Sequence, residues 1–282
     1  MPKYNKHVIV LGSARSGTSW VSENLAKPYR YRMLFEPEHP EQTRNGKLLA
    51  DRWFDNNFEP SKSALNYFNK IFKNRVDSDW IAQNSNRKYK RHLWPFIPKK
   101  FVIKFIRLNL SARYLHDTFK IPIAFITRHP LDLISSQTRA NFPWLYDFTF
   151  FQQQDKLVSF VKKEFGYDLN AINEKSKTEK LAVRWCLENV IPLQYQSIPQ
   201  NDFHIIKYED LRNNIDLYKN LCNDLNFDVL PGIDEEFKKP STKTHPKSTI
   251  RGNQDKRKFI SDDEEELIIK ILKQFKQNLY DI

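Results

Sequence analysis

The sequence predicts an α/β protein with a central, mainly parallel sheet flanked by helices. Three observations predict this fold. Short apolar segments alternate with longer helical stretches, which is typical of strand–helix–strand units. The first apolar segment leads into a glycine-bounded loop and then a helix. Polar motifs also follow several of the predicted strands, and ligands of such sheets bind at the carboxyl ends of strands.

Short runs rich in β-branched and aromatic residues predict five strands. They are His7–Leu11, Met33–Phe35, Phe101–Ile106, Pro122–Thr127 and Phe203–Tyr208. Helical patterns predict seven helices, at Thr18–Ala26, Ser111–Phe119, Leu131–Arg139, Gln152–Glu164, Thr178–Gln196, Glu209–Leu225 and Asp262–Leu279.

The last predicted helix has clear end signals. Ser261 or Asp262 can cap it, and the acidic residues 263–266 suit the positive end of the helix dipole. We expect it to pack on the sheet through one apolar stripe, formed by Leu267, Ile268, Ile271, Leu272, Phe275 and Leu279.

Composition places the chain among globular proteins. The 282 residues, 40% of them hydrophobic and 28% charged, suit one large α/β domain over 1–282. Two irregular stretches, at about 40–100 and 140–175, are interpreted as insertions. The basic residues 87–91 are expected to be a solvated face. The aromatic run 140–151 is expected to be local core, with a lid or binding surface as the alternative.

The formal net charge of +12 favours anionic partners without choosing among them. Cys186 and Cys222 lie in apolar surroundings and are predicted to be buried thiols. No His/Cys spacing is typical of zinc, so no metal is expected. The N-terminus is too polar for a signal peptide, and the apolar runs are too short to span a bilayer, so we expect a cytoplasmic protein.

The loop after the first strand is the most informative motif. Gly12 opens a turn, and Gly17 leads into a helix N-terminus, an arrangement that cradles phosphate. The spacing nearly matches the P-loop of nucleotide kinases, but Thr18 replaces its lysine and Ser19 follows. The nearest cation is Arg15. Because the missing lysine would contact β- and γ-phosphates, the loop suits a ligand without a triphosphate tail.

A second motif follows the fourth predicted strand. Arg128 lies at the carboxyl end of that strand, and Pro130 suits the first turn of the next helix. Ser136 lies two turns into the helix. An anion near this helix start can therefore contact both Arg128 and Ser136.

The two motifs together resemble those of the sulfotransferases that use 3′-phosphoadenosine 5′-phosphosulfate (PAPS). In that family a Gly-X-X-Arg/Lys-Ser-Gly-Thr-Thr/Ser loop binds the 5′-phosphosulfate. An Arg-X-Pro-X-Asp segment, with Ser eight residues after the Arg, binds the 3′-phosphate. This chain has GSARSGTSW at 12–20, RHPLDLISS at 128–136 and a third similar segment, YEDL, at 208–211. The resemblance covers about residues 7–225 and implies a fold like that of P-loop nucleotide kinases.

Two further segments look like the carbohydrate-sulfating branch of this family, Glu36-Pro37 and the Lys-X-X-Arg of residues 104–107. The phenol- and steroid-sulfating branch has a catalytic His in a Lys-Thr-His motif between the phosphate motifs. Here that motif occurs only at 243–245. The resemblance therefore implies sulfuryl transfer from PAPS to an acceptor hydroxyl, with a carbohydrate favoured over a lipid, a peptide tyrosine or a small metabolite.

The resemblance also implies roles. Glu36 is the expected general base, and His39 is the alternative. Arg15 and Lys104 are expected to stabilise the leaving oxygen, so that no metal is required. The expected cofactor-binding residues are Arg15, Ser16, Gly17, Thr18, Ser19, Arg128, Ser136, Tyr208, Arg251 and Gly252.

Other interpretations stay open. A P-loop-type nucleotide or small-molecule kinase would need the lysine that Thr18 replaces. A nucleic-acid-binding protein would use the positive charge, but no helix-turn-helix, RNA-binding or zinc motif supports one. A non-catalytic relative would keep PAPS binding without turnover. The sequence carries no signal for the oligomeric state.

Overall fold

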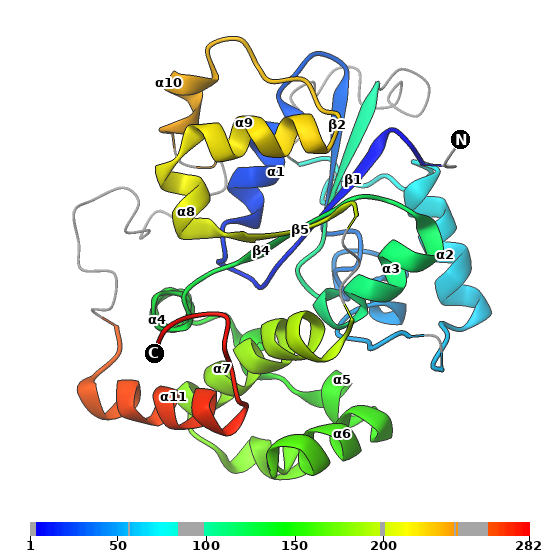
Figure 1. Cartoon of the computed structure of the whole chain (residues 1–282). Helices are drawn as coiled ribbons and strands as arrows, with labels where there is room; N and C mark the ends of the chain where they lie inside the picture. The colour runs from blue at the N-terminus through cyan, green and yellow to red at the C-terminus, as the bar shows by residue number, and fades with distance from the viewer. Residues whose placement is uncertain (1–3, 56, 84–98, 198–200, 240, 242–258) are drawn as a thin grey trace.

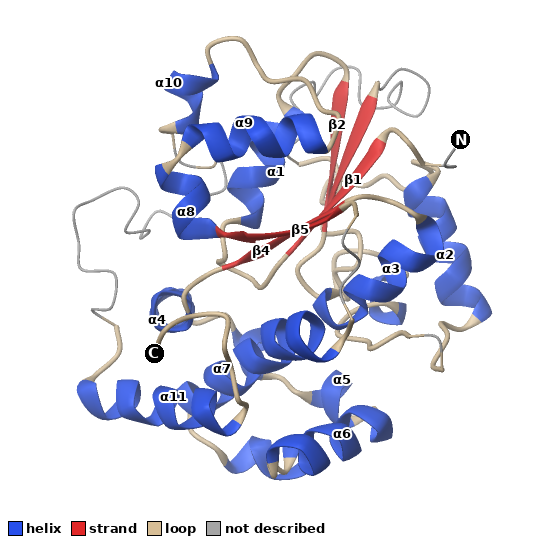
Figure 2. Cartoon of the chain, viewed as in Figure 1, coloured by secondary structure: helices blue, strands red, loops and turns tan. Residues whose placement is uncertain are grey.

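The computed structural model describes residues 4–55, 57–83, 99–197, 201–239, 241 and 259–282. A five-stranded sheet lies at its centre, in the order β2-β3-β1-β4-β5 (Figures 1 and 2). Its strands are β1 (His7–Leu11), β2 (Tyr31–Phe35), β3 (Lys100–Lys104), β4 (Ile123–Thr127) and β5 (Phe203–Lys207). Every neighbouring pair is parallel, which confirms the predicted fold class.

The position of β1 decides where a ligand can bind. β1 is the central strand, with β3 and β2 on one side and β4 and β5 on the other. The chain therefore crosses from one side of β1 to the other between β3 and β4. In open parallel sheets, the crevice at such a reversal of strand order is the usual ligand site. The loop after β1 opens into this crevice.

Helices cover the sheet and extend beyond it (Figure 2). They are α1 (Thr18–Ala26), α2 (Lys62–Phe72), α3 (Ala112–Phe119), α4 (Pro130–Ala140), α5 (Thr149–Gln152), α6 (Asp155–Phe165), α7 (Lys177–Trp185), α8 (Tyr208–Asn213), α9 (Ile215–Asp224), α10 (Ile233–Phe237) and α11 (Asp262–Gln274). A π-helix, η6 (Cys186–Tyr195), continues α7. Short 3₁₀ helices are η1 (Gly46–Leu48), η3 (Asn109–Ser111), η4 (Pro143–Tyr146) and η5 (Leu169–Glu174).

Side chains of the strands alternate between two cores, as the period of a β-strand requires. Ile9 and Leu11 of β1 pack in the same cluster as residues of α2 and α3. Val8 and Val10 face the opposite way, in a cluster with residues of α1, α8 and α9. The central strand β1 is therefore buried on both faces, which fits its near-continuous apolar sequence.

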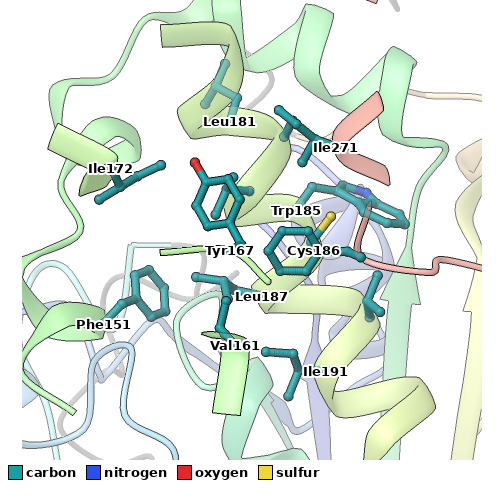
Figure 3. Close-up of a cluster of buried hydrophobic side chains, with 14 of the residues drawn as sticks. Phe151, Val161, Tyr167, Ile172, Leu181, Trp185, Cys186, Leu187, Ile191 and Ile271 are labelled. Atoms are coloured by element: carbon teal, nitrogen blue, oxygen red, sulfur yellow. The ribbon is translucent and has the colours of Figure 1, made fainter. Parts of the chain in front are cut away.

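A third core lies outside the sheet and is built from helices (Figure 3). Ile271 of α11 and Trp185 of α7 belong to it, and α11 packs against α7. The expectation that the last helix packs on the sheet is therefore wrong. Its predicted cap is confirmed, because the side chains of Ser261 and Glu264 form a reciprocal capping box. The third core also contains Cys186, which is buried, as is Cys222.

Several predicted elements differ at their ends for identifiable reasons. β3 stops at Lys104. The backbone N–H of Phe105 still donates to the Val10 carbonyl oxygen, but those of Ile106 and Arg107 donate to the Glu38 carboxylate instead of a neighbouring strand. The helix predicted at 209–225 is divided at Asn214, whose side chain caps α9. The helix predicted at 178–196 becomes a π-helix after Trp185 and contains Pro192.

The two stretches interpreted as insertions contain regular structure. η1 and α2 lie in the first, and η4, α5, α6 and η5 lie in the second. The basic residues 87–91 lie outside the described residues. In the described part of the chain, every helix is too short or too polar to span a bilayer.

Candidate active site

The loop between β1 and α1 needs glycine at two positions. Gly12 has a φ of 149°, and a Cβ there would lie 2.2 Å from the carbonyl oxygen of Ile126. Gly17 has a φ of 100°, and a Cβ there would lie 2.2 Å from the ring of Tyr208. Side chains at these positions would be both strained and blocked. The Tyr208 ring therefore packs directly on the loop, which brings the first and third motifs together in space.

Polar side chains of two helices hold this loop in place. Asn189 of η6 donates to the Ser13 hydroxyl at 3.0 Å and accepts from the Thr127 hydroxyl at 3.2 Å. Gln137 of α4 donates to the carbonyl oxygen of Ala14 at 3.0 Å. The loop is thus fixed by its own surroundings without a ligand, which lowers the entropic cost of binding one.

Three arginines gather beside the loop. Arg15 donates from Nε to the Ser136 hydroxyl at 3.3 Å, and Arg128 donates to the Arg15 carbonyl oxygen at 3.0 Å. Burial, together with the nearby charges of Arg139 and Arg128, lowers the pKa of Arg15 to about 10. Among the described residues, no carboxylate forms an ion pair with any of the three. Such a cluster is suited to bind an anion.

Several buried polar groups at this end lack a hydrogen-bond partner among the described residues. They include the Ser16 hydroxyl, Nε of Arg128 and Nη1 of Arg139. Buried polar groups are nearly always hydrogen-bonded, and exceptions call for an explanation. The Arg128 backbone is itself anchored, because its carbonyl oxygen accepts a hydrogen bond from the indole of Trp185 at 3.1 Å. The guanidinium is therefore held at the loop with part of its hydrogen-bonding capacity unused.

Glu36 lies one residue after β2 and is enclosed by two cations. Lys104 Nζ lies 2.5 Å from its Oε1, and Arg107 Nη1 lies 3.4 Å from its Oε2. The backbone N–H of Glu36 also donates to the Lys104 carbonyl oxygen at 3.0 Å. Burial acts to raise the pKa of Glu36, but the charges of Lys104 and Arg107 outweigh burial and hold that pKa below its ordinary value.

Glu38 is a second buried carboxyl group, which the sequence analysis missed. Its Oε1 accepts from the backbone N–H groups of Ile106 and Arg107 at 2.8 and 3.2 Å. Burial raises the pKa of Glu38 to about 7, and the neighbouring charge of Glu36 contributes in the same direction. Glu38 therefore sets the course of the chain after β3, and with it the position of Arg107.

His39 is neutral at physiological pH. Burial lowers its pKa to about 4, and the charge of Arg107 contributes in the same direction. Its Nδ1 accepts from the backbone N–H groups of Glu41 and Gln42, each at 3.3 Å. A neutral imidazole that accepts at Nδ1 carries its proton on Nε2. His39 therefore offers the cavity a donor.

One cavity of about 380 Å³ joins these groups. The predicted residues that line it are Arg15, Gly17, Thr18, Ser19, Glu36, His39, Lys104, Arg128, Ser136 and Tyr208. Ser16 is buried behind the lining, and Arg251 and Gly252 lie outside the described residues. Aromatic side chains complete the walls. The sequence analysis assigned no site role to Trp20, Phe35 and Trp80, whereas Phe142 and Trp144 belong to the aromatic run 140–151.

The aromatic run 140–151 contributes both to the core and to the wall of the cavity. Leu145, Phe148 and Phe151 are buried in the helical core, which confirms that prediction for them. Phe142 and Trp144 are partly buried, pack against the same core and also line the cavity. The Trp144 ring centre lies 4.0 Å from Cζ of the Arg107 guanidinium, a cation–π contact beside Glu36. This segment therefore forms one wall at the Glu36 end.

Comparison with known proteins gives a result at the level of structure. No protein-family model matches the chain, and no curated protein matches it in sequence. The sulfotransferase domain from the curacin biosynthetic pathway matches over 97% of this chain and 98% of that domain, with a TM-score of 0.50 and 15% identity. The chain has a sulfotransferase fold.

Other structures of this sulfotransferase fold match less well. The sulfotransferase domain from the Synechococcus PCC 7002 olefin synthase matches with a TM-score of 0.45 and 15% identity, over 97% of this chain and 95% of that one. Retinol dehydratase in complex with androsterone and the inactive cofactor PAP matches with a TM-score of 0.42 and 16% identity, over 100% of this chain and 84% of that one. The assignment of the sulfotransferase fold rests on the curacin domain.

Proposed function

We propose that this protein transfers a sulfuryl group from PAPS to a hydroxyl group of a carbohydrate or glycoconjugate. The carrying observation is that one cavity contains the arginine-rich loop at one end and the enclosed Glu36 at the other. The sulfotransferase fold supports the proposal. An in-line displacement needs both reactants in one space, with a base on the acceptor side and cations on the leaving side.

The residues at the loop end fit PAPS. The arginine cluster, which forms no ion pair with the described carboxylates, suits the several negative charges of PAPS. The buried groups of Ser16 and Arg128 that lack a partner among the described residues can hydrogen-bond to its phosphate oxygens. Arg15 and the backbone of residues 16–19 would hold the 5′-phosphosulfate. Arg128 and Ser136 would hold the 3′-phosphate, and the Tyr208 ring would support the adenosine side. When bound, PAPS supplies an activated sulfuryl group on a phosphate leaving group.

Glu36 is the base in this proposal. With its pKa held below the ordinary value, the carboxyl group is ionised at neutral pH and can accept the proton of an acceptor hydroxyl. Lys104 would help to neutralise the leaving oxygen. If Lys104 Nζ moves toward that oxygen, Glu36 loses its closest cation and becomes more basic, because burial then has more weight. His39 would donate from Nε2 to an acceptor oxygen.

The walls at the Glu36 end support a sugar acceptor. Trp80 and Trp144 offer flat apolar surface of the kind that a pyranose ring can cover. The polar atoms of His39 and Arg107 lie at the same end and can bind hydroxyl groups. A site with apolar walls and a few fixed polar groups binds through shape and directed hydrogen bonds.

A screen with ³⁵S-labelled PAPS tests this proposal. It would offer saccharides, lipids, tyrosine peptides and small metabolites to the wild-type protein and to Glu36→Gln. We expect label on a saccharide with the wild type and a loss of at least about a hundredfold with the variant. Label on another class would refute the carbohydrate assignment. Binding of adenosine 3′,5′-bisphosphate without transfer to any class would indicate a non-catalytic relative, and phosphate transfer from ATP–Mg²⁺ would indicate a kinase.

A further inference from the structure

We propose that Arg184 is a positioning residue that holds the aromatic wall at the Glu36 end of the cavity. Arg184 lies on α7, does not line the cavity and is only 1% exposed. This inference rests on the proposed function in one respect, because the wall matters for catalysis only if the acceptor binds there. The contacts by which Arg184 holds the wall do not depend on that function.

The guanidinium of Arg184 binds the backbone of the wall. Nε donates to the carbonyl oxygen of Leu145 at 2.9 Å. Nη2 donates to the carbonyl oxygens of Trp144 and Asp147 at 3.3 and 2.6 Å. Three carbonyl groups within four residues are thus gathered by one side chain. The segment that carries Trp144 includes only the short helix η4, so few regular backbone hydrogen bonds fix its course.

Rings and carboxylates hold the guanidinium itself. Its Cζ lies 4.9 Å from the ring centre of Phe151 and 5.3 Å from that of Phe148. Nη1 donates to Glu188 at 3.0 Å and lies 3.8 Å from an oxygen of Asp51. A planar fork with donors in fixed directions can satisfy carbonyl groups on one side and a carboxylate on the other, which a lysine ammonium cannot.

The wall in turn contacts the candidate catalytic groups. The Trp144 ring lies 4.0 Å from Cζ of Arg107, and Arg107 lies 3.4 Å from Glu36. Asp51 connects the two arginines. Its carboxylate lies 3.8 Å from Arg184 Nη1, and its backbone N–H donates to the Arg107 carbonyl oxygen at 2.7 Å. The contacts from Arg184 to Glu36 are therefore continuous, through Trp144 and Arg107.

Fluorine NMR of protein labelled with 5-fluorotryptophan tests this role without any ligand. The variant is Arg184→Lys, and Trp144→Phe identifies the Trp144 resonance. We expect Arg184→Lys to shift or broaden the Trp144 line and to leave the line of Trp20, at the other end of the cavity, in place. The melting temperature shift caused by adenosine 3′,5′-bisphosphate should stay as in the wild type, because the arginine cluster at the loop is untouched.

Arg32→Lys is the matched control. Arg32 is also 1% exposed and is also held by a carboxylate, Asp77, at 3.0 Å, but it lies on β2 and donates to Asn74 and Asp77. Arg32→Lys should lower the free energy of unfolding and leave the fluorine resonance of Trp144 unchanged. An unchanged Trp144 line in folded Arg184→Lys, or an equal change in Arg32→Lys, overturns the proposal.

A second variant covers the case in which Arg184→Lys does not fold. Arg184→Gln combined with Glu188→Gln removes the charge together with its hydrogen-bonded carboxylate, so that Glu188 is not left as a buried carboxylate without its closest cation. It should displace the Trp144 line in the same way, and an undisturbed line would again refute the role. If the nucleotide fails to bind the wild type, the proposed function fails, while the Trp144 line still decides the role of Arg184.

Discussion

The two ends of the cavity differ in whether their charged side chains are paired within the protein. At the loop end, Arg15 and Arg128 lie close together, and none of the described carboxylates pairs with them. At the other end, Glu36 is buried between Lys104 and Arg107, so its charge is neutralised within the protein. This difference in charge balance matches the role that the proposed function gives to each end. In the proposed function, the first end takes an anion from solution, and the second binds a neutral polar molecule and accepts its proton.

The largest expected effect separates catalysis from nucleotide binding. Glu36→Gln should lower turnover by about a hundredfold or more, since a general base contributes on the order of 10²–10⁴. The affinity for adenosine 3′,5′-bisphosphate should stay unchanged, because the loop end is untouched. Turnover and calorimetric binding are measured on the same preparations. Glu41→Gln, at a nearby exposed position, is the control. Equal losses in both variants would remove Glu36 from the mechanism.

The complementary change is made at the loop end. Arg128→Ala should weaken binding of adenosine 3′,5′-bisphosphate about a hundredfold, since hydrogen bonds to charged groups contribute roughly 1.5–3 kcal/mol each. Calorimetric titration gives the dissociation constants. Arg113→Ala is the control, because Arg113 is paired on the surface with Asp117. An affinity kept by Arg128→Ala would contradict the assignment of the phosphate site.

A smaller effect concerns the stability of the Glu36 end. Glu38 has a pKa of about 7 in the folded protein, above its ordinary value of 4.5. A raised carboxyl pKa gives stability that is complete below the unfolded value and lost as the pH rises through the folded value. Glu38→Gln keeps an oxygen for the two N–H groups but does not ionise. Between pH 5 and 8 the wild type should therefore lose roughly 2 kcal/mol more unfolding free energy than the variant.

Chemical denaturation at a series of pH values measures that difference. Glu23→Gln is the control, at a half-buried position that does not line the cavity. Parallel stability curves for the wild type and Glu38→Gln would show that Glu38 is not held in its protonated form.

The smallest effect concerns the pH at which Glu36 titrates. Lys104→Met removes the closest cation, so burial should prevail and the pKa of Glu36 should rise. A base works when deprotonated, and the acid limb of the pH–rate profile should therefore move to higher pH. Lys100→Met, at the opposite end of the same strand, should leave the limb in place. An acid limb that stays in place in Lys104→Met would refute the electrostatic account of this end.

The loop end was predictable because its signals are local. Each of its two motifs, the loop at 12–20 and the Arg128 motif at 128–136, is a contiguous stretch of sequence. The fold brings the two together where the strand order reverses. The supports of the loop were not predictable. Gln137 and Asn189 are polar residues on helices, and no pattern in the sequence indicates that they hydrogen-bond to a loop more than 100 residues away. Roles in binding PAPS stay predictions.

The Glu36 end was only partly predictable because its contacts are long-range. Glu36 and Lys104 were singled out separately, but their ion pair depends on β2 lying beside β3, across 68 residues of chain. The burial of Glu38 depends on the same pairing. Trp144 was predicted as core rather than wall, since an aromatic run has no sequence signal that separates the two. The helix α2 was missed although Tyr67, Phe68 and Ile71 follow a helical period.

The central claim is that the loop end accepts a nucleotide with a 3′-phosphate. Thermal unfolding of the wild type with adenosine 3′,5′-bisphosphate, compared with adenosine 5′-phosphate at equal concentration, tests it most directly. At about 100 times its dissociation constant, a ligand adds roughly 2.7 kcal/mol of stability. The account predicts a rise of several degrees with the bisphosphate and a much smaller rise with the monophosphate. No rise at millimolar bisphosphate, or an equal rise with both nucleotides, would contradict it.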